Sequence, residues 1–309
     1  MQSAAYFNLP EALPEAAIPE RKNSVHPYNG PQKSTIETNW TTFQEQEMNR
    51  QAVYGVFAGQ IPVIRQKEFL SLEECNQLLE VLRSHTIGDY DVNHVWPRVG
   101  FVGVSQTDYA KDKKTYFSKA EEAYSLQNRW KDELGIDIME RVAQSLEEAS
   151  GLPVRLAREG DQDYFAGVIR AIDTGIQIHA DFARFEGHGW EIGKIAAQMS
   201  WNILLNPVPG GDTFIYDRQW QAPQDDYAWR KVFPKYAYDP RLVDGHAVKV
   251  VKPVPGDLYW FNPRNFHEVR PCDISKDSNQ QAATRYTISS MVGLLEGVDG
   301  QPDTIIMWS

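Results

Sequence analysis

Cysteine is scarce in this chain of 309 residues, which contains only Cys75 and Cys272. Two cysteines can build neither a disulfide framework nor a zinc site of several thiolates, and their scarcity suits a reducing compartment. Apolar runs are short, and none approaches the roughly 20 residues that a membrane-spanning helix needs. The N-terminal residues also lack the basic and apolar segments of a secretory signal. These absences predict a cytoplasmic protein with no membrane segment.

Basic residues are in deficit as well. The chain has 31 Lys and Arg against 42 Asp and Glu, which gives a net charge of −11, and it contains no basic run. This balance argues against nucleic acid and against an anionic membrane surface as partners. The rest of the composition, 42% hydrophobic and 24% charged, is that of an ordinary soluble protein long enough to bury a large core. The composition carries no signal for an oligomeric state.

The pattern along the chain predicts an arm followed by one domain, although length alone favours about two domains. Residues 1–50 are polar and interrupted by prolines, which disfavour regular structure, so we expect an extended N-terminal arm. Residues 51–309 are expected to form a single domain. Its expected parts are first strands at 53–58 and 61–64, a helical support at about 70–150, a β-rich core at about 153–309 and a loop or lid insertion at about 217–246.

Two helices are expected in the support. Ser71 and Glu74 fit a capping box, and apolar residues follow at helical spacing from Leu72 to Leu82. A second helix is expected over about 127–149, where apolar residues line one face and Gly151 suits the C-terminal cap. Both helices are interpreted as scaffold.

Short β-rich runs separated by Gly and Pro dominate the chain from residue 153 onward. The runs are 165–172, 175–179, 199–205, 213–216, 247–251, 258–261, 267–269 and 286–295. Many short strands with turn signals between them favour an all-β sandwich or barrel. The fold class is therefore expected to be mainly β with flanking helices.

The sequence His179-Ala-Asp181 ends one of these runs and suggests a metal site. Side chains two residues apart in an extended chain point to the same side, so His179 and Asp181 can face one point in space. His267, after the run 258–261, is the candidate third ligand. Two imidazoles and one carboxylate form the facial triad of non-haem Fe(II) oxygenases, which leaves coordination positions open.

An arginine follows the last of these residues at a useful distance. Arg285 lies 18 residues after His267. Its planar, permanently charged guanidinium can pair bidentately with a carboxylate such as the distal one of 2-oxoglutarate. Arg270 is an alternative position for this clamp, and Arg170 is a further candidate for cosubstrate contact. Trp201 and Asn202 alternate on one predicted strand, so one of the two is expected to face the barrel interior and contact the cosubstrate.

The order of motifs resembles the Fe(II)/2-oxoglutarate-dependent dioxygenases over about residues 153–309. The motifs are His-x-Asp, Gly-Gly-x-x-Phe from Gly210, Pro-Gly-Asp-x-x-x-Phe from Pro255, His-Glu-Val from His267 and Arg-x-Thr from Arg285. The C-terminal half is similar to the branch that contains carrier-independent alkaloid halogenases and amino-acid hydroxylases. Halogenases of that branch have Gly where this chain has Asp181. The intact carboxylate therefore favours hydroxylation over halogenation.

The resemblance implies a double-stranded β-helix, the jelly-roll of cupin-like proteins, and three cofactors: Fe(II), 2-oxoglutarate and O2. Residue by residue, it implies that His179, Asp181 and His267 bind iron, while Arg285 and Thr287 hold 2-oxoglutarate. The implied reaction hydroxylates an unactivated C–H bond of a small molecule, amino-acid-derived or a specialised metabolite. It is coupled to decarboxylation of 2-oxoglutarate to succinate and CO2.

Other functions stay open. The same cofactors serve desaturation, epimerisation and ring formation. A non-catalytic jelly-roll binding module would keep the fold without turnover, and a cupin-like metal isomerase would not need Arg285. In the insertion, Trp220, Tyr227 and Trp229 are interpreted as lid packing and as candidate substrate contacts that exclude water.

Overall fold

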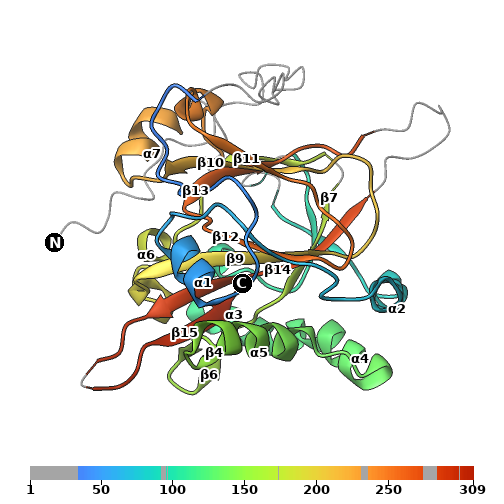
Figure 1. Ribbon diagram of the computed structural model, residues 1–309. Coiled ribbons are helices and arrows are strands. Elements are labelled where there is room, and N and C mark those ends of the chain that lie inside the picture. The colour runs from blue at the N-terminus through green and yellow to red at the C-terminus, as the bar shows by residue number, and fades with distance from the viewer. Residues whose placement is uncertain are drawn as a thin grey trace.

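The computed structural model describes residues 34–91, 95, 97–172, 174–230, 236–273, 284–298 and 300–309. Two β-sheets face each other, and helices α4 and α5 lie along the outer side of the larger sheet (Figure 1). The predicted jelly-roll core with flanking helices is thus confirmed. In the described part of the chain, no helix is long and apolar enough to cross a membrane.

The large sheet has nine strands. Its main path runs β1-β12-β9-β14-β7-β3-β2, and β15 joins β14 and β4 at the side. All pairs are antiparallel except β15 with β4. The bounds are β1 Ile64–Gln66, β2 Gly88–Asp89, β3 Gly100–Val102, β4 Val154–Leu156, β7 Val168–Ile172, β9 Ala197–Leu204, β12 Leu258–Phe261, β14 Arg285–Leu295 and β15 Thr304–Trp308.

The small sheet has four antiparallel strands in the order β11-β10-β13-β8. Its strands are β8 Ile176–His179, β10 Thr213–Gln219, β11 Val248–Val251 and β13 Asn265–Val269. A separate hairpin pairs β5 Arg158–Glu159 with β6 Gln162–Asp163. Each of the eight predicted β-rich runs coincides with a strand, to within a few residues at the ends.

The helices are α1 Arg50–Phe57, α2 Leu72–Arg83, α3 Lys113–Ala123, α4 Ser125–Leu134, α5 Ile138–Ser150, α6 Ala183–Glu186 and α7 Gln224–Trp229. Short 3-10 turns η2 Gln106–Tyr109, η3 Glu191–Lys194 and η4 Pro240–Val243 complete the set. The predicted capping box of α2 is present, since the Ser71 hydroxyl accepts from the Glu74 amide and the Glu74 carboxylate accepts from the Ser71 amide.

The strand expected at 53–58 is wrong, because this segment belongs to helix α1. The Asn49 side chain accepts a hydrogen bond from the Ala52 amide and caps the helix. Val53, Val56 and Phe57 then fall on one buried face at helical spacing. The strand expected at 61–64 is present only at its end, where β1 begins.

The helix expected over 127–149 is two helices. Gly135 takes a left-handed conformation (φ 70°) and ends α4, and the Asp137 side chain caps α5 by accepting from the Glu140 amide. Gly151 caps α5 at its C-terminus, as predicted. In place of one long helix, the chain thus forms α4 and α5, which both pack against the large sheet.

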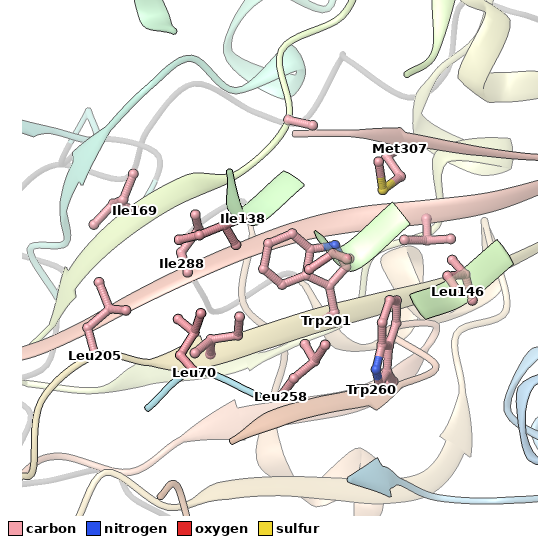
Figure 2. Packing of buried hydrophobic residues seen from close by; sticks show 14 of the residues in the cluster. Leu70, Ile138, Leu146, Ile169, Trp201, Leu205, Leu258, Trp260, Ile288 and Met307 are labelled. Carbon is pink, nitrogen blue, oxygen red and sulfur yellow. The ribbon is translucent and has the colours of Figure 1, made fainter. Parts of the chain in front are cut away.

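The main hydrophobic core lies between the large sheet and the helices. Trp201 of β9 and Trp260 of β12 are fully buried there, with ring centroids 6.4 Å apart. Figure 2 shows these two indoles among apolar side chains that include Leu146 of α5 and Met307 of β15. Side chains alternate along a strand. The residues next to these apolar ones therefore point into the interior between the two sheets. That interior holds the candidate site.

The segment expected as a lid begins inside β10 and includes α7 and η4, while residues 231–235 lie outside the described residues. Its Trp220 and Tyr238 pack on Phe266 and Tyr216 and cover the outer face of the small sheet. Residues 34–46 run along this part of the molecule, where the Thr38 hydroxyl donates to the Asp217 carboxylate at 2.6 Å. The first 33 residues of the expected arm lie outside the described residues.

Candidate metal centre

His179, Asp181 and His267 come together at the end of the small sheet. Asp181 Oδ2 lies 3.8 Å from His179 Nε2 and 3.7 Å from His267 Nε2. One ligand atom from each of the three residues lies within 4.8 Å of the others, and the two imidazole centroids are 4.2 Å apart. The spacing fits three donors around one cation.

Both imidazoles are oriented by the backbone. His179 Nδ1 lies 2.7 Å from the Gln177 carbonyl oxygen, and His267 Nδ1 lies 2.9 Å from the Asn265 carbonyl oxygen. A carbonyl only accepts hydrogen bonds, so each Nδ1 carries the proton and each Nε2 keeps a free lone pair. Burial, with the neighbouring His179, holds the pKa of His267 well below its usual range, so this imidazole stays neutral. Neutral imidazoles with a fixed tautomer are the form that binds metal.

Sheet register and one turn position the three ligands. His267 of β13 pairs directly with His179 of β8. The Asp181 amide donates to the Pro263 carbonyl at 2.9 Å, which fixes the chain just after β8. Pro263 lies in the turn between β12 and β13. Asn262 anchors this turn, because its side-chain amide donates to the Val56 carbonyl at the end of α1. Helix α1 thus supports the turn that joins β12 to β13 and leads to His267.

The donor set fits an iron(II) ion. Two imidazole nitrogens and one carboxylate oxygen form the arrangement that leaves one face of an octahedron open. Among the described residues, no other group of three His, Cys, Asp or Glu side chains meets the same spacing.

Arg285 is buried in the interior at the start of β14. Its side chain is 2% exposed, and Nη2 donates to the Tyr259 hydroxyl at 3.3 Å. Its Nε has no hydrogen-bond partner, and no ion pair joins Arg285 to an acid within the described chain. A buried guanidinium without an anion is unfavourable, so the arrangement suits an incoming carboxylate.

The Gly-Gly motif makes room for this arginine. A Cβ atom at Gly211 would lie 3.1 Å from Cδ of Arg285, and the φ of Gly211 is +74°. Thr287 shares the inward face of β14 two residues later and is 1% exposed. Tyr259, which the sequence reasoning missed, also donates to or accepts from Thr213 at 3.2 Å. Tyr259 therefore connects the small sheet to Arg285.

Arg270 directly follows β13 and lies on the outer face of the small sheet. It is three residues from His267, so its side chain points away from the metal ligands. Its Nη2 lies 3.1 Å from Glu268 Oε1, and its guanidinium stacks over Phe214 with 4.4 Å to the ring centroid. Arg270 is thus engaged on the outer face of the small sheet, and the structure does not bring it to the triad.

Trp201 and Asn202 are separated in the same way. Trp201 lies in the core beneath the large sheet and does not face the interior. Asn202 shares the opposite face of β9 with Ser200, which lines the cavity described below. The interior candidate of this pair is therefore Asn202.

A cavity of about 180 Å³ opens beside two of the ligands. His179 and Asp181 form part of its wall, together with Arg170, Glu186, Ser289 and Tyr236. Trp220, Tyr227 and Trp229 are absent from the described residues that line it. Trp220 packs against Phe185 and Tyr238, and Tyr227 is 55% exposed. Their expected substrate contact is not supported by this placement.

Among the described residues of the insertion, Tyr236 reaches the site. Its ring centroid lies 5.7 Å from that of His179, in an edge-to-face arrangement, and its hydroxyl accepts from the Gln177 amide at 3.3 Å. The sequence offered no spacing signal for it, because the position depends on how the insertion folds back over β8.

Glu186 is an acid on the cavity wall that the sequence reasoning also missed. It lies at the end of α6, and its Oε2 accepts from the Phe182 amide at 3.1 Å. Burial and the nearby Asp181 carboxylate raise the pKa of Glu186 to about 8. It is five residues from Asp181, and the short helix α6 turns it back toward the site.

Comparisons with known proteins agree with this geometry. A family model described as carrier-protein-independent halogenase WelO5 matches residues 38–294. The leucinostatins biosynthesis cluster protein S of Purpureocillium lilacinum is 42% identical over 225 residues, which cover 72% of this chain and 90% of that protein. The L-gamma-glutamyl-L-propargylglycine hydroxylase of Streptantibioticus cattleyicolor is 26% identical over 223 residues, which cover 69% of this chain and 80% of that protein.

A solved structure shares the fold. The N-substituted L-amino acid dioxygenase of Burkholderia ambifaria, in complex with alpha-KG, matches with a TM-score of 0.52 at 15% identity. The match covers 84% of this chain and 91% of that one. At this identity the likeness concerns the fold alone.

Proposed function

The chain belongs to the carrier-protein-independent halogenase WelO5 family of Fe(II)/2-oxoglutarate-dependent oxygenases, and from this premise we propose that it hydroxylates an unactivated C–H bond of a small molecule. The reaction consumes O2 and converts 2-oxoglutarate to succinate and CO2. The observation that carries the proposal is the intact triad, in which Asp181 stands 3.7–3.8 Å from both imidazoles. A carboxylate there fills the coordination position that chloride would need, so hydroxylation is favoured over halogenation.

The residues of this chain hold and orient the reactants. His179, Asp181 and His267 would hold iron through Nε2, a carboxylate oxygen and Nε2. When bound, iron supplies the oxidising chemistry together with 2-oxoglutarate and O2. Arg285 would bind the distal carboxylate of 2-oxoglutarate, since it is buried, positively charged and without an acidic partner in the described chain.

Other interior residues would complete the cosubstrate site. Thr287 lies beside Arg285 on β14 and offers a hydroxyl to the same carboxylate. Tyr259 hydrogen-bonds to Arg285 and fixes its direction. Asn202 faces the interior from the neighbouring strand β9. A positioned arginine and fixed hydroxyls reduce the entropy that the cosubstrate loses on binding.

The substrate is proposed to be amino-acid-derived or a specialised metabolite. One relative is a hydroxylase of a γ-glutamyl dipeptide and another is a leucinostatins biosynthesis cluster protein. The cavity of about 180 Å³ is below the roughly 300–1,000 Å³ typical of sites for drug-sized ligands. Its small volume supports a compact substrate.

An anaerobic titration tests the proposal. We expect Fe(II) and 2-oxoglutarate together to give a weak visible charge-transfer band in the wild-type protein. His179→Ala should abolish the band and lower the iron content, whereas Arg155→Ala, an exposed residue of β4, should leave both unchanged. An absent band in the wild type, with metal content insensitive to His179→Ala, would leave a non-catalytic binding module as the better reading.

A screen of small molecules then identifies the reaction. Each candidate is scored by O2-dependent release of succinate above the level without substrate. The product mass separates the outcomes, since hydroxylation adds one oxygen atom, desaturation removes two hydrogens and epimerisation leaves the mass unchanged. Products without added oxygen would replace hydroxylation by one of the other reactions of the same cofactors.

A further inference from the structure

The cavity beside His179 and Asp181 has a cationic wall made by Arg170. This arginine lies on the inward face of β7, two residues from Val168, which also lines the cavity. Its Nη1 donates to the Ser289 hydroxyl of β14. Burial raises the pKa of the Tyr90 phenol, and the positive charge and a side-chain hydrogen bond of Arg170 oppose that rise. Both partners are neutral hydroxyl groups.

Within the residues that the structure describes, no acid forms an ion pair with Arg170, although Asp181 and Glu186 line the same cavity. A guanidinium has five N–H donors, and two hydroxyl partners leave donors for a ligand. A charged group in a partly buried cavity is most stable when an anion joins it, and a carboxylate matches the guanidinium bidentately.

Arg170 and Arg285 serve different spaces. Arg170 lines the cavity, whereas Arg285 is absent from its described lining and lies instead against Tyr259 and Gly211. On the sheet, Arg170 pairs with Thr287 and therefore lies beside the proposed cosubstrate residues, while Arg285 pairs with Ile172 at the end of β7. With Arg285 assigned to 2-oxoglutarate, Arg170 is available for the second organic reactant.

Glu186 supplies an acid to the same cavity. No ion pair joins Glu186 to a basic side chain of the described chain, and Arg230 on the insertion is bound instead to Asp226 at 3.3 Å. One of its oxygens accepts from the Phe182 amide, which leaves the other for a ligand. Hydrogen-bond donors that suit a carboxyl group are ammonium and amide N–H groups.

We propose, on the basis of the function proposed above, that this cavity binds a small amino acid or N-acyl amino acid through its carboxylate on Arg170 and its nitrogen on Glu186. The two arginines then divide the two carboxylates of the reaction, one from the cosubstrate and one from the substrate. The triad lies on the wall of the same cavity, so a bound carbon chain is presented to the metal.

Equilibrium dialysis with defined probes tests this assignment. The iron-loaded protein with 2-oxoglutarate is dialysed anaerobically against three pools: the proteinogenic L-amino acids, their N-acetyl derivatives and their carboxamides. Retained compounds are identified by mass spectrometry. We expect at least one acid to be retained and its carboxamide to be retained far less. Equal retention of acid and carboxamide, or retention of no acid, would overturn the proposal.

Variants assign the two ends of the substrate. Arg170→Gln keeps a hydrogen bond to Ser289 but removes the charge, and should weaken acid binding by about 10- to 150-fold, the range for hydrogen bonds to charged groups. Arg170→Lys should recover part of the loss. Glu186→Gln should alter the preference between free and N-acetyl amino acids. Arg155→Gln, an exposed arginine in a different groove, is the matched control and should change nothing.

The charge-transfer band with 2-oxoglutarate separates the two proposals. If Arg170→Gln still shows the charge-transfer band at the 2-oxoglutarate concentration used for the wild type, but no longer retains the acid, the assignment stands. If it loses the band, Arg170 belongs to the cosubstrate site and the assignment falls. If the wild type shows the band yet binds no acid selectively, the oxygenase function stands and this inference alone fails.

Discussion

The sharpest test of the site compares two arginines that the sequence alone left as rivals. Arg285→Gln and Arg270→Gln remove the same charge, the first at the start of β14 and the second just after β13. Arg285 is buried in the interior, and its hydrogen-bond partner among the described residues is the Tyr259 hydroxyl. Arg270 lies on the outer face, paired with Glu268 at 3.1 Å and stacked on Phe214. The two substitutions should therefore have opposite effects.

Arg285→Gln should weaken the binding of 2-oxoglutarate strongly and leave the stability of the metal-free protein unchanged. Truncating one partner of a buried, hydrogen-bonded charge pair costs about 2–5 kcal/mol, which is about 30- to 4,000-fold in the affinity for 2-oxoglutarate. The metal-free protein should not become less stable, because Arg285 forms no ion pair within the described chain and glutamine can still reach Tyr259. The affinity is measured by anaerobic titration of the charge-transfer band, and stability by thermal unfolding.

Arg270→Gln should do the reverse. It leaves the Glu268 carboxylate with the Tyr216 hydroxyl, at 2.7 Å, but without its cation. Removing one partner of a buried ion pair lowers the free energy of unfolding by about 3–5 kcal/mol. The affinity for 2-oxoglutarate should stay at the wild-type value. The reasoning is refuted if Arg285→Gln binds 2-oxoglutarate as tightly as the wild type, or if Arg270→Gln loses that binding in a folded protein.

Three further outcomes are expected. Asp181→Gly should lose hydroxylation and bind Fe(II) more weakly, because two imidazoles remain; full activity and normal iron content would remove Asp181 from the ligand set. His267 has a lowered pKa in the folded chain, so the metal-free protein should lose stability as pH falls below about 6.5. The unfolded chain then takes up a proton that the folded chain refuses, and His267→Gln should flatten this dependence in urea unfolding measured across that range. Ser71→Ala removes the capping box of α2 and should lower the free energy of unfolding by about 1 kcal/mol, with cosubstrate affinity unchanged as the control.

Local signals predicted the elements whose causes are local. Helix α2 was predictable because its capping box lies within four consecutive residues. The strands from residue 165 onward were predictable because Gly and Pro residues separate them. Helix α1 was not, because the apolar residues 53–58 read as a strand when Asn49 is not recognised as its cap. The segment that forms β3, η2 and α3 carried no motif, and β15 was not predicted at all.

The metal ligands followed from a motif, but the surroundings depended on which face of a strand each residue takes. For Arg270 the signal was available, since three residues from His267 places it on the opposite face. For Trp201 and Asn202, the alternation of side chains predicted only that the two lie on opposite faces of the strand. The choice between them was made by α5 and its neighbours, which pack beneath β9 and bury the indole. Contacts between distant parts of the chain decide such choices, and Tyr236 and Glu186 reach the cavity for the same reason.

The two faces of the large sheet explain how a polar interior can be stable. Trp201, Trp260, Ile288 and Val292 face the helices, and this outer face carries the hydrophobic stabilisation. The inner face is then free to hold Arg170, Arg285, Thr287 and Ser289, whose burial would be unfavourable in the main core. Because the inner arginines have hydroxyl partners rather than acids within the described chain, the unpaired charge remains available to anionic reactants. An acid introduced beside Arg285, at Thr287, should therefore stabilise the metal-free protein and prevent 2-oxoglutarate from binding, and unfolding measurements on Thr287→Glu would show whether stability and binding do oppose each other at this face.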